Sequence, residues 1–302
     1  MQQKKQNILL IKHGAFGDLI QSDGILKSIK LRHPNFNLIL LTSSAYKKLM
    51  RMSPYIDDII VDDRVPLWNF KSYYCLIKYI NSYNFSHVYD LQNSQRTLGY
   101  KIFLLKNAIW VTTNRKDHPK SGLQGLVDML KDDGMTLNEI YEPDISWMTN
   151  DVSLLLNRKN ISKKYIVLFP GSSKKHPEKR WPFYRDIAKE FIGRGFDVIN
   201  ILGPDELGLK QDLVGHILES LEWGDLAGVI DKSVFTIGND SGPSHIASCL
   251  KKPGIALFGP TTSGSKSELA RAPFKIIETE DLDSLSSADL FKIIIKSYSF
   301  LR

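Results

Sequence analysis

The chain has 302 residues, of which 42% are hydrophobic and 24% are charged, and its formal net charge is +7. This length predicts two domains of roughly 150 residues, and the composition excludes extended disorder. No apolar run reaches the ~20 residues of a membrane span and no apolar signal region precedes the first strand, so we expect a cytoplasmic protein with two buried, reduced cysteines, Cys75 and Cys249. The positive charge favours an anionic partner, but no helix-turn-helix, zinc-finger or RNA-binding pattern indicates nucleic acid.

Apolar strands alternate with helical stretches along the first half of the chain. A helix is predicted over residues 18–32, and Pro34 follows its end. Two more helices are predicted over residues 73–83 and 95–105. The predicted strands of this half are residues 7–11, 38–41, 59–61 and 87–90.

The same alternation continues in the second half. Helices are predicted over residues 182–194 and 290–300, and a capping box from Ser286 to Asp289 opens the second of them. The predicted strands are residues 165–169, 197–202, 234–237 and 255–258. This pattern predicts an α/β fold with doubly wound parallel sheets, in which ligands bind at the carboxyl ends of the strands.

The domain boundaries are expected where the periodicity weakens. Residues 138–150, which include Pro143, are the best candidate linker. We therefore predict one Rossmann-like domain over residues 1–148 and a second over residues 149–283. Residues 284–302 are expected to form a C-terminal helix that packs back toward the first domain.

A glycine-rich turn follows the first strand and ends in a carboxylate, in the order Gly14-Ala15-Phe16-Gly17-Asp18. The turn lacks the third glycine of a dinucleotide fingerprint, and no acidic residue closes the second strand, so a nicotinamide or flavin cofactor is not expected. A carboxylate at this edge of a sheet suits a catalytic base. The position equally suits a helix N-cap, so both interpretations stay open at this point.

Hydroxyl groups and cations follow the strand at residues 165–169. Ser172 and Ser173 come directly after it, and Lys179 and Arg180 precede the next helix. Such groups at a strand end suit phosphate oxygens, although charges before a helix are also common as solvated surface residues.

A second strand-turn-helix lies at Asp240-Ser241-Gly242-Pro243-Ser244-His245. Glycine in the turn and proline in the first helical turn leave free N–H groups at the positive end of the helix dipole, which suits a phosphate. His245 is equally explained as a structural histidine. Asp281 and Asp283 have the spacing of a metal-binding pair but fall in a polar loop, and no metal site is predicted.

Taken in order, these motifs resemble glycosyltransferase family 9, the bacterial heptosyltransferases of lipopolysaccharide core synthesis. The matching stretches are residues 11–18, 90–92, 170–173, 179–182, 240–245 and 258–261. The resemblance covers nearly the whole chain and implies a GT-B fold, with two Rossmann-like domains facing across a cleft. It implies an inverting, metal-independent transfer without a cofactor, from ADP-L-glycero-D-manno-heptose to a lipid A–Kdo oligosaccharide.

The resemblance also implies roles for individual residues of an acceptor-binding first domain and a donor-binding second domain. Asp18 matches the general base, Lys179 matches a phosphate-binding lysine, Asp205 or Glu206 matches a ribose contact, and Trp223 lies near the adenine. The implied donor-binding residues are Ser172, Ser173, Lys179, Arg180, Asp205, Glu206, Trp223, Asp240, Ser241, Gly242 and His245. The implied residues of the cleft are His13, Gly14, Gly17, Asp90 and Gln92. The chain departs from the family at Asn93-Ser94, where many members have a small glycine-containing turn, and this bears on the acceptor.

A glycolipid acceptor would bring the enzyme to the anionic inner face of the bacterial inner membrane. Residues 68–74 and 78–79 mix aromatic side chains with lysines, as interfacial surfaces do, and as an amphipathic helix packed on a sheet also does. Three alternative functions stay open. They are a GT-B transferase for another sugar nucleotide, a sugar-nucleotide hydrolase or epimerase that uses His13 or His118, and a non-catalytic binding module.

Overall fold

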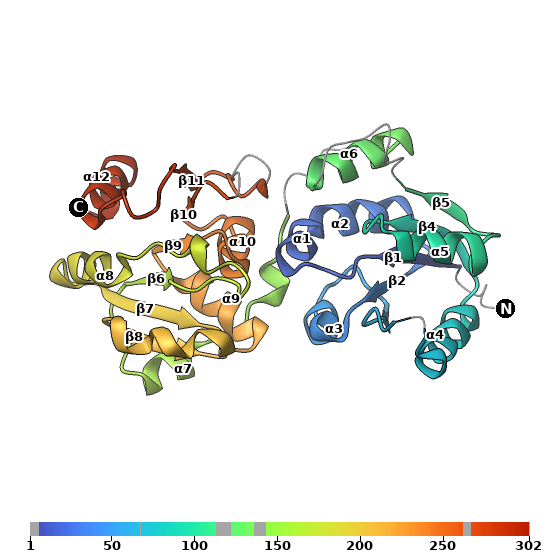
Figure 1. The fold of residues 1–302 in the computed structure, drawn as a ribbon, viewed down its shortest axis with the longest axis horizontal. Coiled ribbons are helices and arrows are strands. Elements are labelled where there is room, and N and C mark those ends of the chain that lie inside the picture. Colours follow the sequence, from blue (N-terminus) through green and yellow to red (C-terminus); the bar gives the residue numbers. More distant parts are fainter. Residues whose placement is uncertain (1–5, 67, 113–121, 136–142, 262–266, 302) are drawn as a thin grey trace. The chain divides into compact units, whose positions relative to one another are not determined.

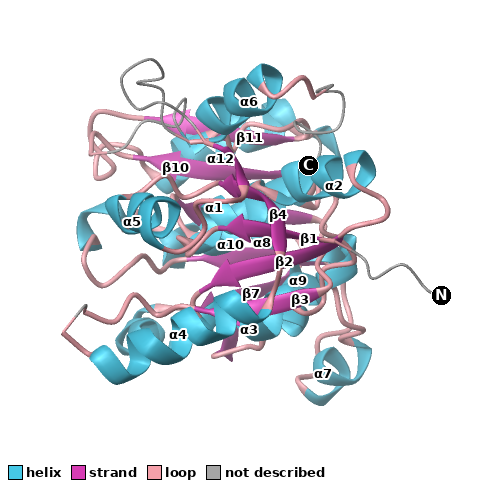
Figure 2. Cartoon of the chain, turned by 90° about the vertical axis from the view of Figure 1, so that its right-hand side faces the viewer, coloured by secondary structure: helices cyan, strands magenta, loops and turns pink. Residues whose placement is uncertain are grey.

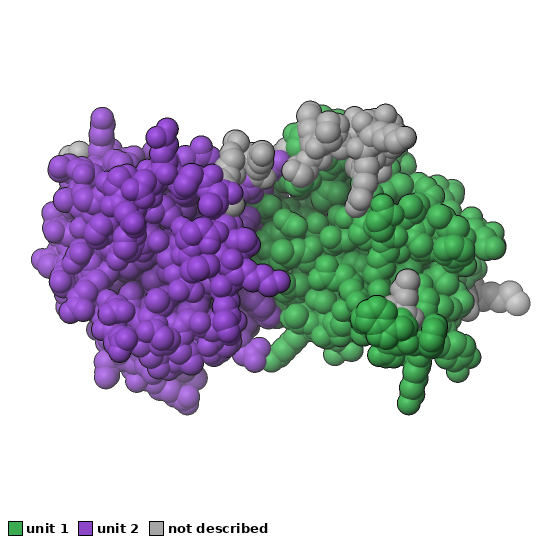
Figure 3. Space-filling view, in the orientation of Figure 1, with its two compact units in different colours: residues 1–147 green, residues 148–302 purple. Residues whose placement is uncertain are grey.

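The computed structural model describes residues 6–66, 68–112, 122–135, 143–261 and 267–301. The chain divides into two compact units, Met1–Trp147 and Met148–Arg302 (Figures 1 and 3). His118 and residues 138–142 of the predicted linker lie outside the described residues. Within the described ranges, no helix is both long enough and apolar enough to cross a membrane.

The first unit is built on a five-stranded parallel sheet with the order β3-β2-β1-β4-β5. Helices flank the strands in both views of the chain (Figures 1 and 2). The strands are β1 (Asn7–Ile11), β2 (Asn37–Thr42), β3 (Asp58–Val61), β4 (Phe85–Asp90) and β5 (Ile109–Val111). The helices are α1 (Phe16–Gln21), α2 (Asp23–Arg32), α3 (Ser44–Met50), α4 (Phe70–Ser82), α5 (Gln95–Phe103) and α6 (Leu123–Asp132).

Alternation along β1 explains how this sheet is covered. Leu9 and Ile11 pack in one cluster with Leu76 and Ile80 of α4 and Tyr100 of α5. The intervening residues of the strand are also fully buried, and they face the opposite side of the sheet because successive side chains of a strand alternate. A strand that is apolar on both faces needs helices on both faces, as a doubly wound fold provides.

The helix predicted over residues 18–32 is two helices, α1 and α2, separated by Ser22. Asp23 opens α2, and its buried carboxylate accepts hydrogen bonds from the Asp144 amide at 3.0 Å and from Trp147 Nε1 at 3.0 Å. Burial raises the pKa of Asp23 to about 6, although both hydrogen bonds oppose the shift. The end of the first unit is thereby held on the helix pair that follows β1.

The second unit is built on a six-stranded parallel sheet with the order β11-β10-β9-β6-β7-β8. Its strands are β6 (Tyr165–Phe169), β7 (Asp197–Leu202), β8 (His216–Glu219), β9 (Phe235–Asn239), β10 (Gly254–Phe258) and β11 (Phe274–Glu278). Its α-helices include α7 (Ser153–Arg158), α8 (Tyr184–Gly193), α9 (Trp223–Lys232), α10 (Gly242–Cys249) and α12 (Ser287–Ser297). Short 3-10 helices are η1 (Ser146–Met148), η2 (Pro177–Lys179), η3 (Pro204–Asp212) and η4 (Ser299–Leu301).

The core of the second unit joins the sheet to α8 and α12. Phe191 of α8 and Phe291 of α12 pack edge to face at 5.4 Å between ring centroids, within the same cluster as β6 and β9. The predicted capping box is confirmed in part, because the Ser286 side chain accepts from the Asp289 amide. The further expectation, that residues 284–302 pack toward the first domain, stays a prediction.

Three strands, β5, β8 and β11, were not predicted from the sequence, because each is short and only partly buried. One cysteine prediction is wrong, since Cys75 is exposed on α4, while Cys249 is buried as expected. The parallel α/β fold class is confirmed in both units.

Candidate active site

Asp18 lies in the first turn of α1, immediately beyond the carboxyl end of β1. The N-cap of this helix is Ala15, so the interpretation of Asp18 as the capping residue is wrong. Its side chain is 54% exposed and therefore accessible to a ligand. The location near the helix N-terminus favours the negative charge of the carboxylate.

Gly14 shapes the turn that leads to Asp18. Its φ of +135° lies in a region that L side chains rarely adopt. A Cβ atom at this position would stand 2.7 Å from Cε2 of Tyr46, so the turn has no room for a side chain. The glycine is required by both the backbone and its neighbour.

Lys12 is a site residue that the sequence analysis missed. Its Nζ lies 3.6 Å from Asp18 Oδ2 and donates to the Leu91 carbonyl at 3.3 Å. Burial lowers the pKa of the Lys12 ammonium, against the opposing effect of the Asp18 and Asp90 carboxylates. Both members of this ion pair line a small pocket, together with Gln21, Gly122, Leu123 and Leu126. A lysine directly after a strand is common, so the only indication of this role in the sequence was the position of Lys12 beside the predicted turn.

His13, Gln92 and Asp90 meet where β1 and β4 end side by side. The His13 amide donates to Gln92 Oε1 at 2.9 Å. Asp90 Oδ1 accepts from the amides of Gln92 at 3.1 Å and Asn93 at 2.8 Å, and burial raises the pKa of this carboxyl. Three expected residues are therefore brought together, with Asp90 shaping the loop from inside.

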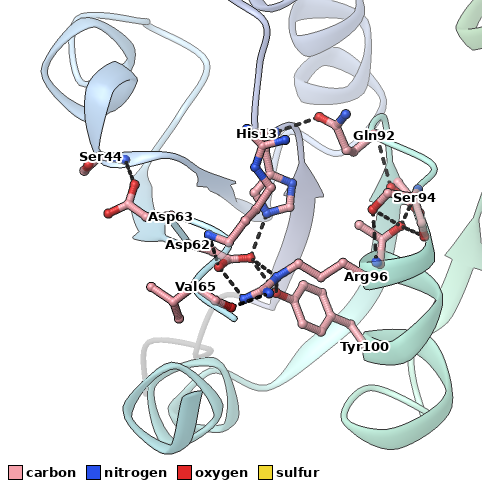
Figure 4. A network of polar contacts seen from close by, with 12 residues as sticks. His13, Ser44, Asp62, Asp63, Val65, Gln92, Ser94, Arg96 and Tyr100 are labelled. Carbon is pink, nitrogen blue, oxygen red and sulfur yellow. Dashed lines mark hydrogen bonds and ion pairs between the residues drawn. The ribbon is translucent and has the colours of Figure 1, made fainter. Parts of the chain in front are cut away.

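The His13 side chain belongs to a buried polar network that the sequence analysis did not predict (Figure 4). His13 Nε2 lies 2.8 Å from Asp62 Oδ2, and Arg96 donates to both carboxylate oxygens of Asp62 at 2.8 and 2.7 Å. The Tyr100 hydroxyl donates to Asp62 Oδ2 at 2.5 Å. Because the His13 ring is fully enclosed, no observation favours the hydrolase or epimerase role that we left open for it.

In the second unit, Asn239 ties together the two loops that carry the expected donor residues. This fully buried side chain stands at the end of β9. Its Nδ2 donates to the Gly171 carbonyl at 2.9 Å and to the Pro170 carbonyl at 3.2 Å. Its Oδ1 accepts from the Trp181 amide at 3.1 Å and from the Tyr184 hydroxyl at 2.9 Å. The sequence alone does not single out Asn239, because an asparagine in an exposed loop and one that is buried and holds two loops together have the same local pattern.

Two pairs of expected donor residues are in direct contact. Lys179 Nζ donates to Asp240 Oδ2 at 2.7 Å, and both side chains are largely buried. Arg180 Nε donates to Ser172 Oγ at 3.0 Å, and this hydroxyl in turn donates to the His176 carbonyl at 2.8 Å. Lys179 and Arg180 are adjacent in the sequence, and each is held by a side chain with which it forms a hydrogen bond.

Glu206 reaches the same loop from η3, whereas Asp205 is exposed. A Cβ atom on Gly171 would stand 1.9 Å from Glu206 Cδ, so the glycine makes room for this carboxylate. Glu206 Oε2 accepts from the Gly203 amide at 2.7 Å. Burial raises the pKa of Glu206, with Arg180 acting in the opposite direction. Of the two candidates for a ribose contact, Glu206 is the one that lies against the loop after β6.

The N-terminus of α10 carries the remaining turn. Ser241 is its N-cap, and the Ser241 Oγ atom is buried without a hydrogen-bond partner among the described residues. Ser244 Oγ donates back to the Asn239 carbonyl at 2.7 Å, and the His245 amide bonds to the Ser241 carbonyl at 3.4 Å. Gly242 is the first residue of the helix, so its amide is one of those without an intrahelical partner.

Two residues stand apart from this group. Ser173 is exposed, and Trp223 begins α9 beyond β8, the edge strand that is separated from β6 by β7. Within the described parts of the chain, no group of three His, Cys, Asp or Glu side chains could hold a metal ion.

The chain is similar to several known proteins. The sequence profile of Glycosyltransferase family 9 (heptosyltransferase) matches residues 140–277. Lipopolysaccharide heptosyltransferase 2 of Salmonella typhimurium (strain LT2) is 22% identical, over 84% of this chain and 83% of that protein. A glycosyl transferase family 9 structure from Veillonella parvula DSM 2008 has a TM-score of 0.81 at 19% identity, covering 100% of this chain and 98% of that one. The E. coli heptosyltransferase WaaC, solved with ADP-2-deoxy-2-fluoro heptose, has a TM-score of 0.74 at 14% identity, covering 96% and 99%.

Two parallel α/β units with this likeness define a GT-B fold. The sequence matches narrow the class further. They support a glycosyltransferase, because the family 9 (heptosyltransferase) profile matches residues 140–277 and the relatives that cover most of the chain are lipopolysaccharide or lipooligosaccharide heptosyltransferases.

Replacing the clamp residue should loosen the loop after β6. We expect Asn239→Ala to lower the free energy of unfolding by about 3 kcal/mol, because it leaves buried donors and acceptors unpaired. Amide hydrogen exchange in residues 170–181 should become faster. The matched control is Asn200→Ala, which removes another buried asparagine of the same sheet, bonded to Val214 and His216. Urea unfolding and exchange mass spectrometry check the result, and unchanged exchange in that loop would contradict the role of Asn239.

Proposed function

We propose that the protein transfers heptose, or a closely related sugar, from an ADP-sugar to the lipopolysaccharide core or a similar glycan. The observation that carries the proposal is the pair of ion-paired sites at strand ends, Lys12 with Asp18 in the first unit and Lys179 with Asp240 in the second. The first provides a base for a hydroxyl group, and the second provides cations for a diphosphate. WaaC, a relative in fold, has been solved with ADP and with an ADP-heptose analogue, which supports an ADP-sugar donor.

The second unit would bind the donor diphosphate. Lys179, Arg180, the Ser241 hydroxyl and the free amides at the start of α10 are donors or cations suited to phosphate oxygens. A diphosphate that takes Lys179 releases Asp240, whose carboxylate then suits hydroxyl groups of the donor sugar. The charge that develops on the departing ADP would be stabilised by these groups of the chain, so we propose a reaction that needs no metal.

The first unit would activate the acceptor. The acceptor oxygen attacks the anomeric carbon on the face opposite ADP and forms the new glycosidic bond. The bond between that carbon and the phosphate oxygen breaks, and its electron pair leaves with ADP, so the configuration inverts. The acceptor proton passes to Asp18, and the adjacent Lys12 ammonium holds that carboxylate in place beforehand.

The helices α4 and α5 form a surface suited to a lipid-linked acceptor. Both pack on the same face of the first sheet. Large apolar or aromatic side chains are exposed on them and beside them, namely Trp68, Phe70, Tyr74, Tyr79, Leu98, Ile102 and Phe103. From residue 64 to residue 107 the only acidic residue is Asp90, which is buried, while six residues are Lys or Arg. We therefore propose that this surface contacts the anionic inner membrane.

Removing the base should abolish turnover and spare donor binding. We expect Asp18→Asn to lower kcat at least about a hundredfold, because an amide does not take up the acceptor proton. ADP affinity should stay unchanged, as measured by calorimetry beside a transfer assay with ADP-heptose. Asp57→Asn, which breaks an ion pair with Lys30 elsewhere in the same unit, is the matched control. Near-normal transfer by the Asp18 variant would refute the assignment.

Removing Lys179, the proposed phosphate-binding cation, should weaken ADP binding, whereas removing Asp18 should not. Lys179→Ala is expected to weaken ADP binding about tenfold to a hundredfold, the value of one charge-assisted hydrogen bond. Lys189→Ala removes an exposed lysine that pairs with Asp186 in the same unit and serves as the control. Calorimetric titration with ADP gives the answer, and equal affinities for the Lys179 variant and the unmodified protein would remove this lysine from the site.

Reversing charge on the α4 surface should weaken membrane binding. The variant K71E/K78E is expected to bind vesicles containing phosphatidylglycerol at least about tenfold less tightly, since each surface lysine contributes about 1 kcal/mol. The control K47E/K48E makes the same charge change on α3. Co-sedimentation at several salt concentrations measures the effect. Binding that is insensitive to salt, or that falls equally in both variants, speaks against this surface.

A further inference from the structure

Three loops leave the carboxyl edge of the first sheet, and Asp62 is the point where they are joined. Asp62 follows β3, and its side chain is 1% exposed. It receives His13 from the loop after β1, and it receives Arg96 and Tyr100 from α5, which begins after the β4 loop. Arg96 also donates to the Val65 carbonyl at 2.9 Å, further along the loop after β3. Figure 4 shows these side chains converging on the Asp62 carboxylate.

The Asp62 carboxylate is unusually well provided with donors. The Arg96 guanidinium spans both oxygens, the Tyr100 hydroxyl and His13 Nε2 reach Oδ2, and the Arg64 amide reaches Oδ1 at 2.9 Å. Burial alone would raise the pKa of Asp62, but the hydrogen bonds from His13, Arg96 and Tyr100 outweigh it and hold the pKa below its ordinary value. The carboxylate is therefore a permanent anion inside the unit.

Such a network is poorly explained by stability alone. A buried ion pair is expensive to desolvate, and apolar residues of similar volume often give equal or greater stability. Contacts between charged groups depend on direction, whereas apolar contacts do not. A bidentate arginine and a carboxylate therefore fix each other's orientation. The network thus provides geometry that a hydrophobic contact would not.

The geometry that it fixes is that of His13. The His13 ring is held by Asp62, and the His13 amide is held by Gln92. Lys12 precedes His13, and Gly14, with its positive φ, follows it and leads into α1. Both members of the Lys12–Asp18 ion pair are therefore carried by backbone that starts from this one clamped residue.

We infer that Asp62, with Arg96 and Tyr100, is a positioning group that holds the loop after β1, and through it Asp18, in the geometry required for proton removal. The inference rests on the proposed function for the role of Asp18 as a base, but its structural part does not. Asp62 acts through His13 and touches no reacting atom.

The test uses mild variants, because Asp62→Asn leaves two donors facing an amide and risks unfolding the unit. Tyr100→Phe removes one hydroxyl and keeps the ring, and Arg96→Lys keeps the charge and loses the bidentate contact. The control is Tyr83→Phe. The Tyr83 hydroxyl donates to Asp58 at the amino end of β3, so the control breaks another Tyr–Asp hydrogen bond at the opposite edge of the same sheet.

Two measurements separate positioning from stability. Amide hydrogen exchange should become faster over residues 12–21 in Tyr100→Phe and Arg96→Lys, and stay unchanged there in Tyr83→Phe. With ADP-heptose and a glycan acceptor, kcat should fall about tenfold in the two network variants, because small displacements of a catalytic group are costly. The affinity for ADP, which the second unit binds, should stay the same.

Each outcome decides one question. Unchanged exchange over residues 12–21 in both network variants, or an equal change in Tyr83→Phe, overturns the inference. Faster exchange with an unchanged kcat overturns the positioning role. If the unmodified protein transfers nothing from ADP-heptose while the exchange pattern is as expected, the proposed function fails and the clamp on the loop stands.

Discussion

Loops that leave the carboxyl edge of a parallel sheet must bring polar groups close to a buried sheet, and those groups need partners of fixed direction. In this protein each unit has a buried polar side chain that provides such partners at a strand end. Asn239 ends β9 in the second unit and holds the loop after β6. Asp62 follows β3 in the first unit and holds the loop after β1. The proposed site residues Lys12 and Lys179 lie on the loops that these two side chains hold.

In each unit a lysine of the candidate site forms an ion pair with a carboxylate. Lys12 and Lys179 are buried or nearly so, and a buried ammonium without a partner is costly. Pairing with Asp18 and with Asp240 relieves that cost without closing the site, since Asp18 is half exposed. In the proposed reaction both pairs change partners: Lys179 turns to a diphosphate, and Asp18 takes up a proton. Under this proposal the two ion pairs are the resting arrangement of the groups that take part in the reaction.

The network around Asp62 connects this chemistry to the rest of the first unit. Arg96 stands on α5 and lies over the ring of Tyr73 on α4, with 5.9 Å from its guanidinium carbon to the ring centroid. The same two helices present the basic and aromatic surface proposed to meet the membrane. The residues that hold the loop after β1 are therefore part of the framework that carries this proposed membrane surface, because α4 and α5 share one face of the sheet.

The alternation of strands and helices, and the order of the glycine-rich, hydroxyl-rich and acidic turns, could be predicted from the amino-acid sequence alone. Apolar periodicity and turn residues act on neighbouring residues, so they can be recognised in the sequence. The strands β1, β6 and β7, for example, have their predicted bounds. The folded structure was needed to show that Glu206 lies against Gly171 and that Asp62, Arg96 and Asn239 hold the loops of their units together. These roles arise from contacts between residues far apart in the chain. A buried polar side chain has no local pattern, because its partners are supplied by strand order rather than by its neighbours in sequence.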